Sequence, residues 1–174
     1  MHRHADHDEI SGWFAGRLND GWFAAAPEVS IDREEILVVG ELPDVELAKD
    51  ATDAARAAAR VARVDAFREE TRGSRMHVAD EAQHRFGRAV SWGVRIGGDE
   101  HLFTTLAVPA MTRLRMSERA TLDTLVSAGV ARSRADGLAW CVKLVAEHEA
   151  EWISGLREAL AEVEKRRASG PRPD

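Results

Sequence analysis

Residues 111–145 constrain the fold of this chain more than any other segment, because one short strand and two helices follow from their pattern. In residues 111–116, every second position from 112 onward is uncharged, and two of the three positions between them are arginines. This is the period-2 pattern of a half-buried strand. One predicted face carries Thr112, Leu114 and Met116, and the other carries Met111, Arg113 and Arg115. The second face therefore presents two guanidinium groups.

Two helices are predicted after this strand. Ser117 is a suitable N-cap for the first, and Gly129 stands where a left-handed glycine ends a helix. Ser133 is a suitable N-cap for the second, with Asp136 in the place of the capping-box acid. The apolar stripe of this second helix consists of Leu138, Cys141, Val142 and Val145, with Trp152 two turns later.

This segment resembles the ribbon-helix-helix superfamily of DNA-binding proteins, the MetJ/Arc type. The matching parts are Leu114-Arg115-Met116, Leu122-Asp123-Thr124-Leu125-Val126, Gly129 and Ser133-Arg134-Ala135-Asp136-Gly137. The match is confined to the C-terminal segment. Pro109 just before the strand and Gly137 inside the second helix depart from the pattern, and such a glycine costs roughly 1 kcal/mol relative to alanine.

The resemblance implies a homodimer in which two strands pair antiparallel and enter the major groove of double-stranded DNA. It places Met111, Arg113 and Arg115 against the bases and Arg132, Ser133 and Arg134 against a phosphate. Arginine bonds guanine in bidentate fashion, and a helix N-terminus attracts anions. Two alternatives stay open: an ordinary helical hairpin with solvated arginines, and a ribbon-helix-helix unit that only dimerises.

Two aromatic pairs near the N-terminus form a local repeat, Trp13-Phe14 and Trp22-Phe23, each preceded by glycine and followed by alanine. Large aromatic side chains of this kind pack over a sheet edge or present a surface to a protein partner. The first eight residues contain three histidines and two aspartates, and we expect a flexible, solvated start there.

The middle of the chain predicts an α+β domain. Residues 28–32 and 35–40 indicate a hairpin around an Asp-Arg turn, and Ala-rich residues 44–86 indicate a long helix with a break at Gly73-Ser74. Residues 89–96 and 102–108 flank a Gly-Gly turn and predict a second hairpin. The expected organisation is an α+β domain over 1–109, a ribbon-helix-helix-like segment over 110–165 and a disordered tail over 166–174.

Composition limits the classes of function. The net charge of −6 is unlike a general nucleic-acid coat, although residues 110–150 hold six basic against five acidic side chains. Cys141 is the single cysteine, the apolar runs are too short to span a membrane, and the N-terminus lacks a secretory pattern, so we expect a cytoplasmic protein. His77 and His84 have no third ligand nearby, and no catalytic motif is present, so no metal, cofactor or enzymatic activity is predicted.

The sequence thus predicts a dimeric DNA-binding protein, a transcription regulator that reads the major groove with a short basic strand. The alternative is a non-catalytic protein-protein interaction or ribonucleoprotein-associated module. Its contact surfaces would be the aromatic pairs Trp13-Phe14 and Trp22-Phe23 together with the long helix.

Overall fold

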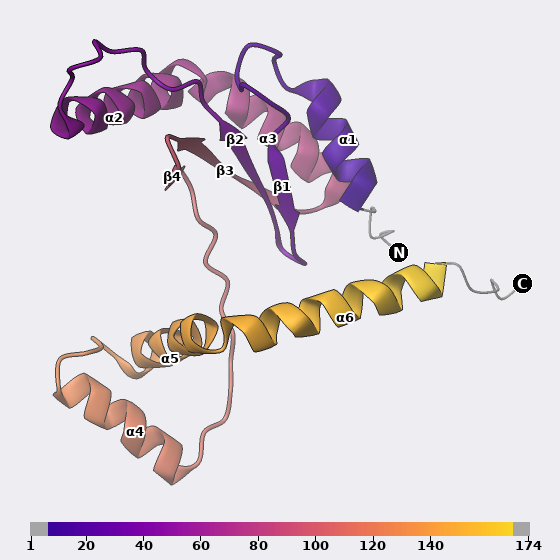
Figure 1. The fold of residues 1–174 in the computed structure, drawn as a ribbon. Coiled ribbons are helices and arrows are strands. Elements are labelled where there is room, and N and C mark those ends of the chain that lie inside the picture. The colour runs from indigo at the N-terminus through magenta and orange to yellow at the C-terminus, as the bar shows by residue number, and fades with distance from the viewer. Residues whose placement is uncertain (1–6, 169–174) are drawn as a thin grey trace, which may run out of the picture. The chain divides into compact units, whose positions relative to one another are not determined.

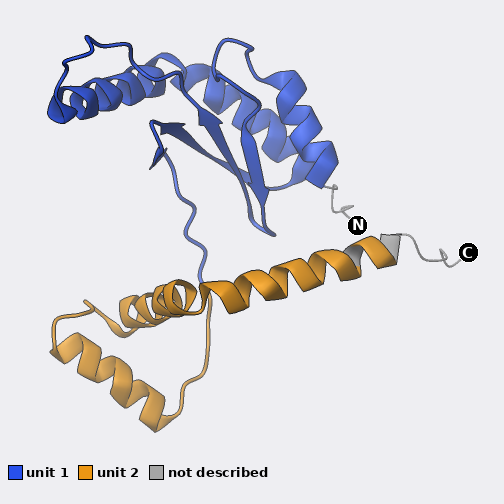
Figure 2. Cartoon of the chain, viewed as in Figure 1, with its two compact units in different colours: residues 1–109 blue, residues 110–174 orange. Residues whose placement is uncertain are grey.

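The computed structural model describes residues 7–168 and shows a mixed α+β chain (Figure 1). It divides into two compact units, residues 1–109 (unit 1) and 110–174 (unit 2), coloured separately in Figure 2. Unit 1 holds all four strands, and unit 2 is built from helices.

Unit 1 contains one four-stranded sheet in the spatial order β1-β2-β3-β4. Its strands are β1 (Glu28–Ile31), β2 (Glu35–Glu41), β3 (Ala89–Ile96) and β4 (Asp99–Leu102). The outer pairs β1/β2 and β3/β4 are antiparallel hairpins, and the central pair β2/β3 is parallel. A parallel pair needs a crossover connection, which α2 (Asp53–Glu70) and α3 (Arg72–Phe86) supply.

Turn residues fix both hairpins. In the first, the Asp32 carboxylate accepts hydrogen bonds from the backbone of Glu34 at 2.9 Å and of Glu35 at 2.6 Å, so the predicted Asp-Arg turn is confirmed. In the second, Gly97 and Gly98 have φ values of +60° and +91°, which a two-residue hairpin turn requires and which other residues rarely adopt.

The strand predicted over 102–108 is wrong, since β4 ends at Leu102 and residues 104–115 form no regular secondary structure. The Phe103 N–H still bonds the Trp92 carbonyl at 2.8 Å. The Trp92 N–H then goes to the Thr104 hydroxyl at 3.2 Å instead of to a backbone carbonyl. A side chain thus takes the place of the next ladder bond, and the pairing stops.

The long helix predicted over 44–86 is two helices with a later start. Residues 42–52 form a loop, and Thr52 caps α2 by accepting from the Ala55 N–H at 3.2 Å. The break lies at Thr71, whose hydroxyl donates back to the Phe67 carbonyl at 2.6 Å, and not at Gly73-Ser74, which lies inside α3. Local side-chain bonds of threonine therefore set both boundaries.

The core of unit 1 lies between one face of the sheet and three helices. The face is formed by alternate residues of the central strands, among them Ile36, Val38 and Val94, each with no exposed surface. α1 (His7–Arg17), which the sequence did not predict, lies beside α3 over this face (Figure 1) and buries Ile10 and Phe14 completely.

The two aromatic pairs belong to this core. Phe14 has no exposed surface, and Trp13 contacts it edge-on with ring centroids 4.9 Å apart. Trp22 and Phe23 follow α1 and contact the Phe67 ring of α2 at 6.0 and 5.6 Å. The prediction that these rings contact a protein partner is therefore wrong for Phe14. The other three rings are partly buried in contacts within unit 1.

Asp44 forms a bidentate ion pair with Arg60 of α2, with oxygen-nitrogen distances of 2.6 and 3.0 Å. Hydrogen bonds from Arg60, and then from the Val45 N–H, lower the pKa of Asp44 from 3.8 to about 2. A carboxylate with a depressed native pKa stabilises the fold above its unfolded pKa, and this contribution is lost as the pH falls.

We therefore expect part of the stability of unit 1 to be lost between pH 4 and pH 2, with a small amplitude because the pair is exposed to solvent. The carboxyl ¹³C shift of Asp44, followed by NMR across this range, checks the expectation. Asp44→Asn should flatten the pH dependence of the unfolding free energy in the same window. A midpoint near 3.8 for Asp44 would contradict the pairing.

Unit 2 consists of α4 (Met116–Ser127), α5 (Arg134–His148) and α6 (Ala150–Ala168). Gly129, with φ of +73°, follows α4 as predicted. Ser133 caps α5 as predicted, accepting from the Asp136 N–H at 3.2 Å. The predicted cap Ser117 is wrong, because the N-cap of α4 is Arg115, two residues earlier, and the Arg115 N–H donates to the Glu118 carboxylate.

Gly137, which departs from the family pattern, lies where α4 and α5 cross. A Cβ atom added there would lie 3.4 Å from Leu122 and 3.5 Å from Ala131, both of which are buried. Both distances are ordinary van der Waals contacts, so an alanine would fit at this position and the crossing of the two helices does not require glycine.

Two expectations concern the termini. α6 continues to Ala168, so the predicted disordered tail is wrong for residues 166–168, and residues 169–174 lie outside the described residues. In the His-rich start, residues 1–6 also lie outside them, and His7 opens α1. Within residues 7–168 no group of three or more potential ligands is placed to hold a metal ion, and no helix is long and apolar enough to cross a membrane.

Candidate nucleic-acid interface

The basic segment, residues 111–115, lies in the stretch without regular structure that precedes α4. Met111 is 98% exposed, and Arg113 and Arg115 are exposed as well. Leu114 between the arginines is half-buried. Thr112 and Met116, the other two residues of the predicted inward face, are exposed, so residues 111–116 show no period-2 alternation of burial.

The strand predicted over Met111–Met116 is absent from this single chain, and Met116 is already the first residue of α4. A strand requires a second backbone to bond with, and the sheet of unit 1 ends at β4. The backbone groups of residues 111–113 have no partner strand among the described residues, which is the condition in which a segment can pair with another chain.

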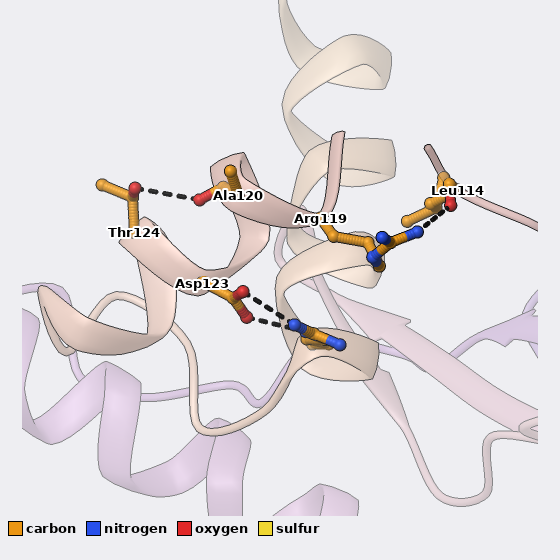
Figure 3. A network of polar contacts seen from close by, with 6 residues as sticks. Leu114, Arg119, Ala120, Asp123 and Thr124 are labelled. Carbon is orange, nitrogen blue, oxygen red and sulfur yellow. Dashed lines mark hydrogen bonds and ion pairs between the residues drawn. The ribbon is translucent and has the colours of Figure 1, made fainter. Parts of the chain in front are cut away.

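Side-chain bonds hold the end of the basic segment against α4. Arg119 donates from Nη1 to the carbonyl of Leu114 at 2.6 Å (Figure 3). Together with the Arg115–Glu118 bond, this contact fixes the direction in which the chain enters the helix. The two arginines predicted to meet DNA therefore emerge next to an ordered helix end.

The residues predicted to contact phosphate, Arg132, Ser133 and Arg134, surround the N-terminus of α5 in unequal roles. Arg134 forms a bidentate pair with Asp123 of α4, with both distances 2.7 Å. Figure 3 marks these two bonds at the labelled Asp123. This hydrogen bonding raises the pKa of Arg134 and lowers that of Asp123. Arg134 thus joins α5 to α4, and its planar fork is already occupied.

Arg132 is the freer cation of the set. Its side chain is 93% exposed and lies 3.5 Å from Asp136, a separation at the weak end for an ion pair. The Asp136 carboxylate also accepts from the Arg132 N–H at 2.9 Å, and this bond lowers its pKa. The Asp136 carboxylate therefore already lies at this helix end. A phosphate bound there would accept hydrogen bonds from the same free N–H groups and interact with the same positive end of the helix dipole.

Unit 2 buries few of its apolar side chains. Among its described residues, Leu122 and Ala131 are the buried hydrophobic ones. Large apolar side chains at least 38% exposed occur along α5 and α6, namely Trp140, Val142, Val145, Trp152, Leu156, Leu160 and Val163. Trp152, predicted on the second helix, belongs to α6, a separate element that was not predicted. The signal was the 3-4-3 spacing of Ile153, Leu156, Leu160 and Val163.

Comparisons with known proteins match both parts of the chain. Residues 8–102 match the family model "Rv1265-like protein, N-terminal domain", and residues 115–167 match "Mb1296 C-terminal domain". The uncharacterized proteins Mb1296 of Mycobacterium bovis and Rv1265 of Mycobacterium tuberculosis are each 58% identical over 159 residues, which cover 91% of this chain and 69% of the relative. No solved structure matched the chain.

Proposed function

Since the chain belongs to the Rv1265-like protein family, whose matched relatives carry names without an activity, we propose from its own residues that it is a homodimeric DNA-binding transcription regulator. Unit 2 acts as a ribbon-helix-helix unit, and Met111, Arg113 and Arg115 reach the bases of the major groove. The proposal depends on one observation: a basic segment without a partner strand precedes helices that leave most of their apolar side chains exposed.

A second copy of unit 2 would supply the partner strand that the basic segment lacks. Two segments over residues 111–115, paired antiparallel, satisfy each other's backbone groups. Residues on one face of the pair are then Met111, Arg113 and Arg115, while Leu114 points to the helices, in keeping with its partial burial. Two arginines from each copy form a basic ribbon narrow enough for the major groove.

A second copy would also cover the exposed apolar side chains of unit 2. A segment of this length rarely folds stably on so small a core, and an additional interface is the usual remedy. The exposed side chains of α5 and α6 provide one. The overall charge of −6 does not oppose local DNA binding, because the contact is limited to one edge of unit 2.

The geometry divides the phosphate contacts predicted from the family pattern. The Arg132 side chain is the group of this set that we propose for a phosphate contact, in competition with the Asp136 carboxylate, whereas Arg134 positions α5 through Asp123. The alternative of an aromatic partner surface is not favoured by any observation, because Phe14 is enclosed and the other rings pack within unit 1.

The test uses DNA fragments that the wild-type protein selects from a random oligonucleotide library. Arg113→Ala/Arg115→Ala is expected to weaken binding of these fragments at least about 100-fold, because each bidentate base contact contributes about 1–3 kcal/mol and the dimer holds four arginines. Fluorescence anisotropy at fixed salt measures the affinity, and repeating it at several salt concentrations separates base contacts from phosphate contacts.

Arg33→Ala/Arg63→Ala is the matched control, because it removes two exposed positive charges from unit 1. It should bind the selected fragments within about threefold of wild type, the scale of a non-specific charge effect. Equal affinities for wild type and Arg113→Ala/Arg115→Ala, or the failure of the wild type to enrich any fragment, would refute DNA reading by the basic segment.

A further inference from the structure

A cavity of about 400 Å³ lies within unit 1, between the α2-α3 junction, β3 and the residues that follow β4. Three arginines line it, Arg68, Arg72 and Arg75, and Glu69 is the single carboxylate among the lining side chains. The remaining wall is largely apolar and includes Trp92 and Phe103. The size is within the range of small-molecule sites.

Arg75 is the innermost of the three cations and is only 7% exposed. Its Nε donates to the Thr71 hydroxyl at 2.9 Å and its Nη2 donates to the Arg68 carbonyl at 2.7 Å. Its guanidinium carbon lies 4.8 Å from the centre of the Phe103 ring, and that of Arg68 lies 5.8 Å from the same ring. These contacts fix the guanidinium and leave the N–H groups of Nη1 for a group in the cavity.

The charge of this cluster is only partly compensated, because Glu69 is the one carboxylate of the lining that attracts Arg75. Within residues 7–168, no ion pair joins Arg68, Arg72 or Arg75 to a carboxylate, whereas Arg17 and Arg60 of the same unit each have one and Arg95 has two. Burial, and then repulsion from Arg68 and Arg72, lower the pKa of Arg75. A buried guanidinium without a carboxylate partner, as at Arg75, is costly for a fold and is typical of ligand sites.

We infer that this cavity binds a small phosphorylated ligand, with the phosphate held by Arg68, Arg72 and Arg75 and an apolar portion lying against Trp92 and Phe103. Three guanidiniums against one carboxylate match a doubly charged phosphate better than a singly charged carboxylate. Arginine's planar fork bonds phosphate oxygens in pairs, as a lysine cluster would not. The site lies wholly in unit 1 and does not depend on the DNA-binding proposal.

The probes are inorganic pyrophosphate and phenyl phosphate, with phenol as the uncharged counterpart and sodium chloride at matched ionic strength. Both phosphates should raise the thermal unfolding midpoint of the full chain, since a ligand that binds only the folded state stabilises it. Phenol should not. Calorimetry should give a Kd for phenyl phosphate that is about tenfold or more weaker for Arg68→Ala/Arg72→Ala, as loss of charge-assisted bonds predicts.

Both substituted arginines are exposed, so this variant should fold, and Arg33→Ala/Arg63→Ala should bind like wild type. Arg75→Lys, which keeps the charge and loses the planar fork, should also weaken binding. Equal stabilisation of all variants, or none at millimolar phosphate, would overturn the proposal. So would loss of DNA-fragment binding by Arg68→Ala/Arg72→Ala without any response of the wild type to the phosphates, because the cluster would then be a nucleic-acid contact.

Discussion

Replacing Phe14 with alanine is expected to lower the unfolding free energy of unit 1 by about 3–5 kcal/mol, the usual cost of emptying a buried aromatic site. Phe14 has no exposed surface, and its ring meets Trp13 and Trp92 edge-on at centroid distances of 4.9 and 6.1 Å. The side chain therefore joins α1 to the central strand β3. The cavity left behind would loosen the helix that covers this face of the sheet.

Urea unfolding followed by circular dichroism measures the loss, and hydrogen exchange of the β2 and β3 amides assigns it to unit 1. Val61→Ala is the control, because Val61 of α2 is 51% exposed and its truncation should cost less than about 0.5 kcal/mol. A cost below about 1 kcal/mol for Phe14→Ala would contradict the packing of α1.

Local signals in the sequence were sufficient for the hairpins. Asp32 and the Gly97-Gly98 pair define turns through bonds and dihedral angles that involve only neighbouring residues. The parallel pairing of β2 with β3 was not predicted, because it joins Glu35 to Ala89 across two helices, and no local pattern encodes such a contact. The aliphatic run Ile36–Val39 lies in β2, and its residue types do not specify the strand with which it pairs.

Helix boundaries were less predictable, because several residues competed for the same role. Asp44 had the position of a helix-initiating acid, yet its carboxylate is bound to Arg60 and the helix begins after Thr52. At the α2-α3 junction, Gly73 was the obvious breaker, but the Thr71 hydroxyl, bonded to Phe67 and to Arg75, marks the boundary. A long-range ion pair at Asp44 and local hydrogen bonds of Thr71 thus decided between signals of similar strength.

The candidate DNA interface shows the same limit. Ser133 and Gly129 were predictable as the ends of helices, since capping is local. The pair of Arg134 with Asp123 was not, and it changes Arg134 from a phosphate contact into a link between helices. Whether residues 111–115 form a strand depends on a partner chain, which a single sequence does not display and a single chain does not provide.

The stripe of Ile153, Leu156, Leu160 and Val163 on α6 leads to the second large expected effect. Leu156 is 45% and Leu160 62% exposed, and the 3-4-3 spacing places the four side chains along one face of the helix. If two copies of unit 2 form the functional dimer, this face is the largest apolar surface available to it. Leu156→Glu/Leu160→Glu is therefore expected to convert a dimeric protein into a monomer.

The expected loss of association free energy follows from the apolar area of each leucine that is still exposed in the single chain and would be buried in the dimer. Full burial of a leucine contributes about 1.5–3 kcal/mol, and roughly half of that remains to be gained here by each of four side chains in a dimer. Losing roughly 3–6 kcal/mol weakens association by about two to four orders of magnitude, before the repulsion of four added carboxylates is counted. Size-exclusion chromatography with light scattering over a range of concentrations measures the change.

Ser154→Glu/Ala161→Glu is the matched control, because it adds the same two charges to exposed positions on the opposite side of α6. This variant should remain dimeric and bind the selected DNA fragments. Leu156→Glu/Leu160→Glu should lose DNA binding together with the dimer, because an unpaired basic segment has no ribbon to place in the groove. A wild type that is monomeric at tens of micromolar, or a monomeric variant with full DNA affinity, would contradict the proposed pairing of residues 111–115 between two copies of the chain.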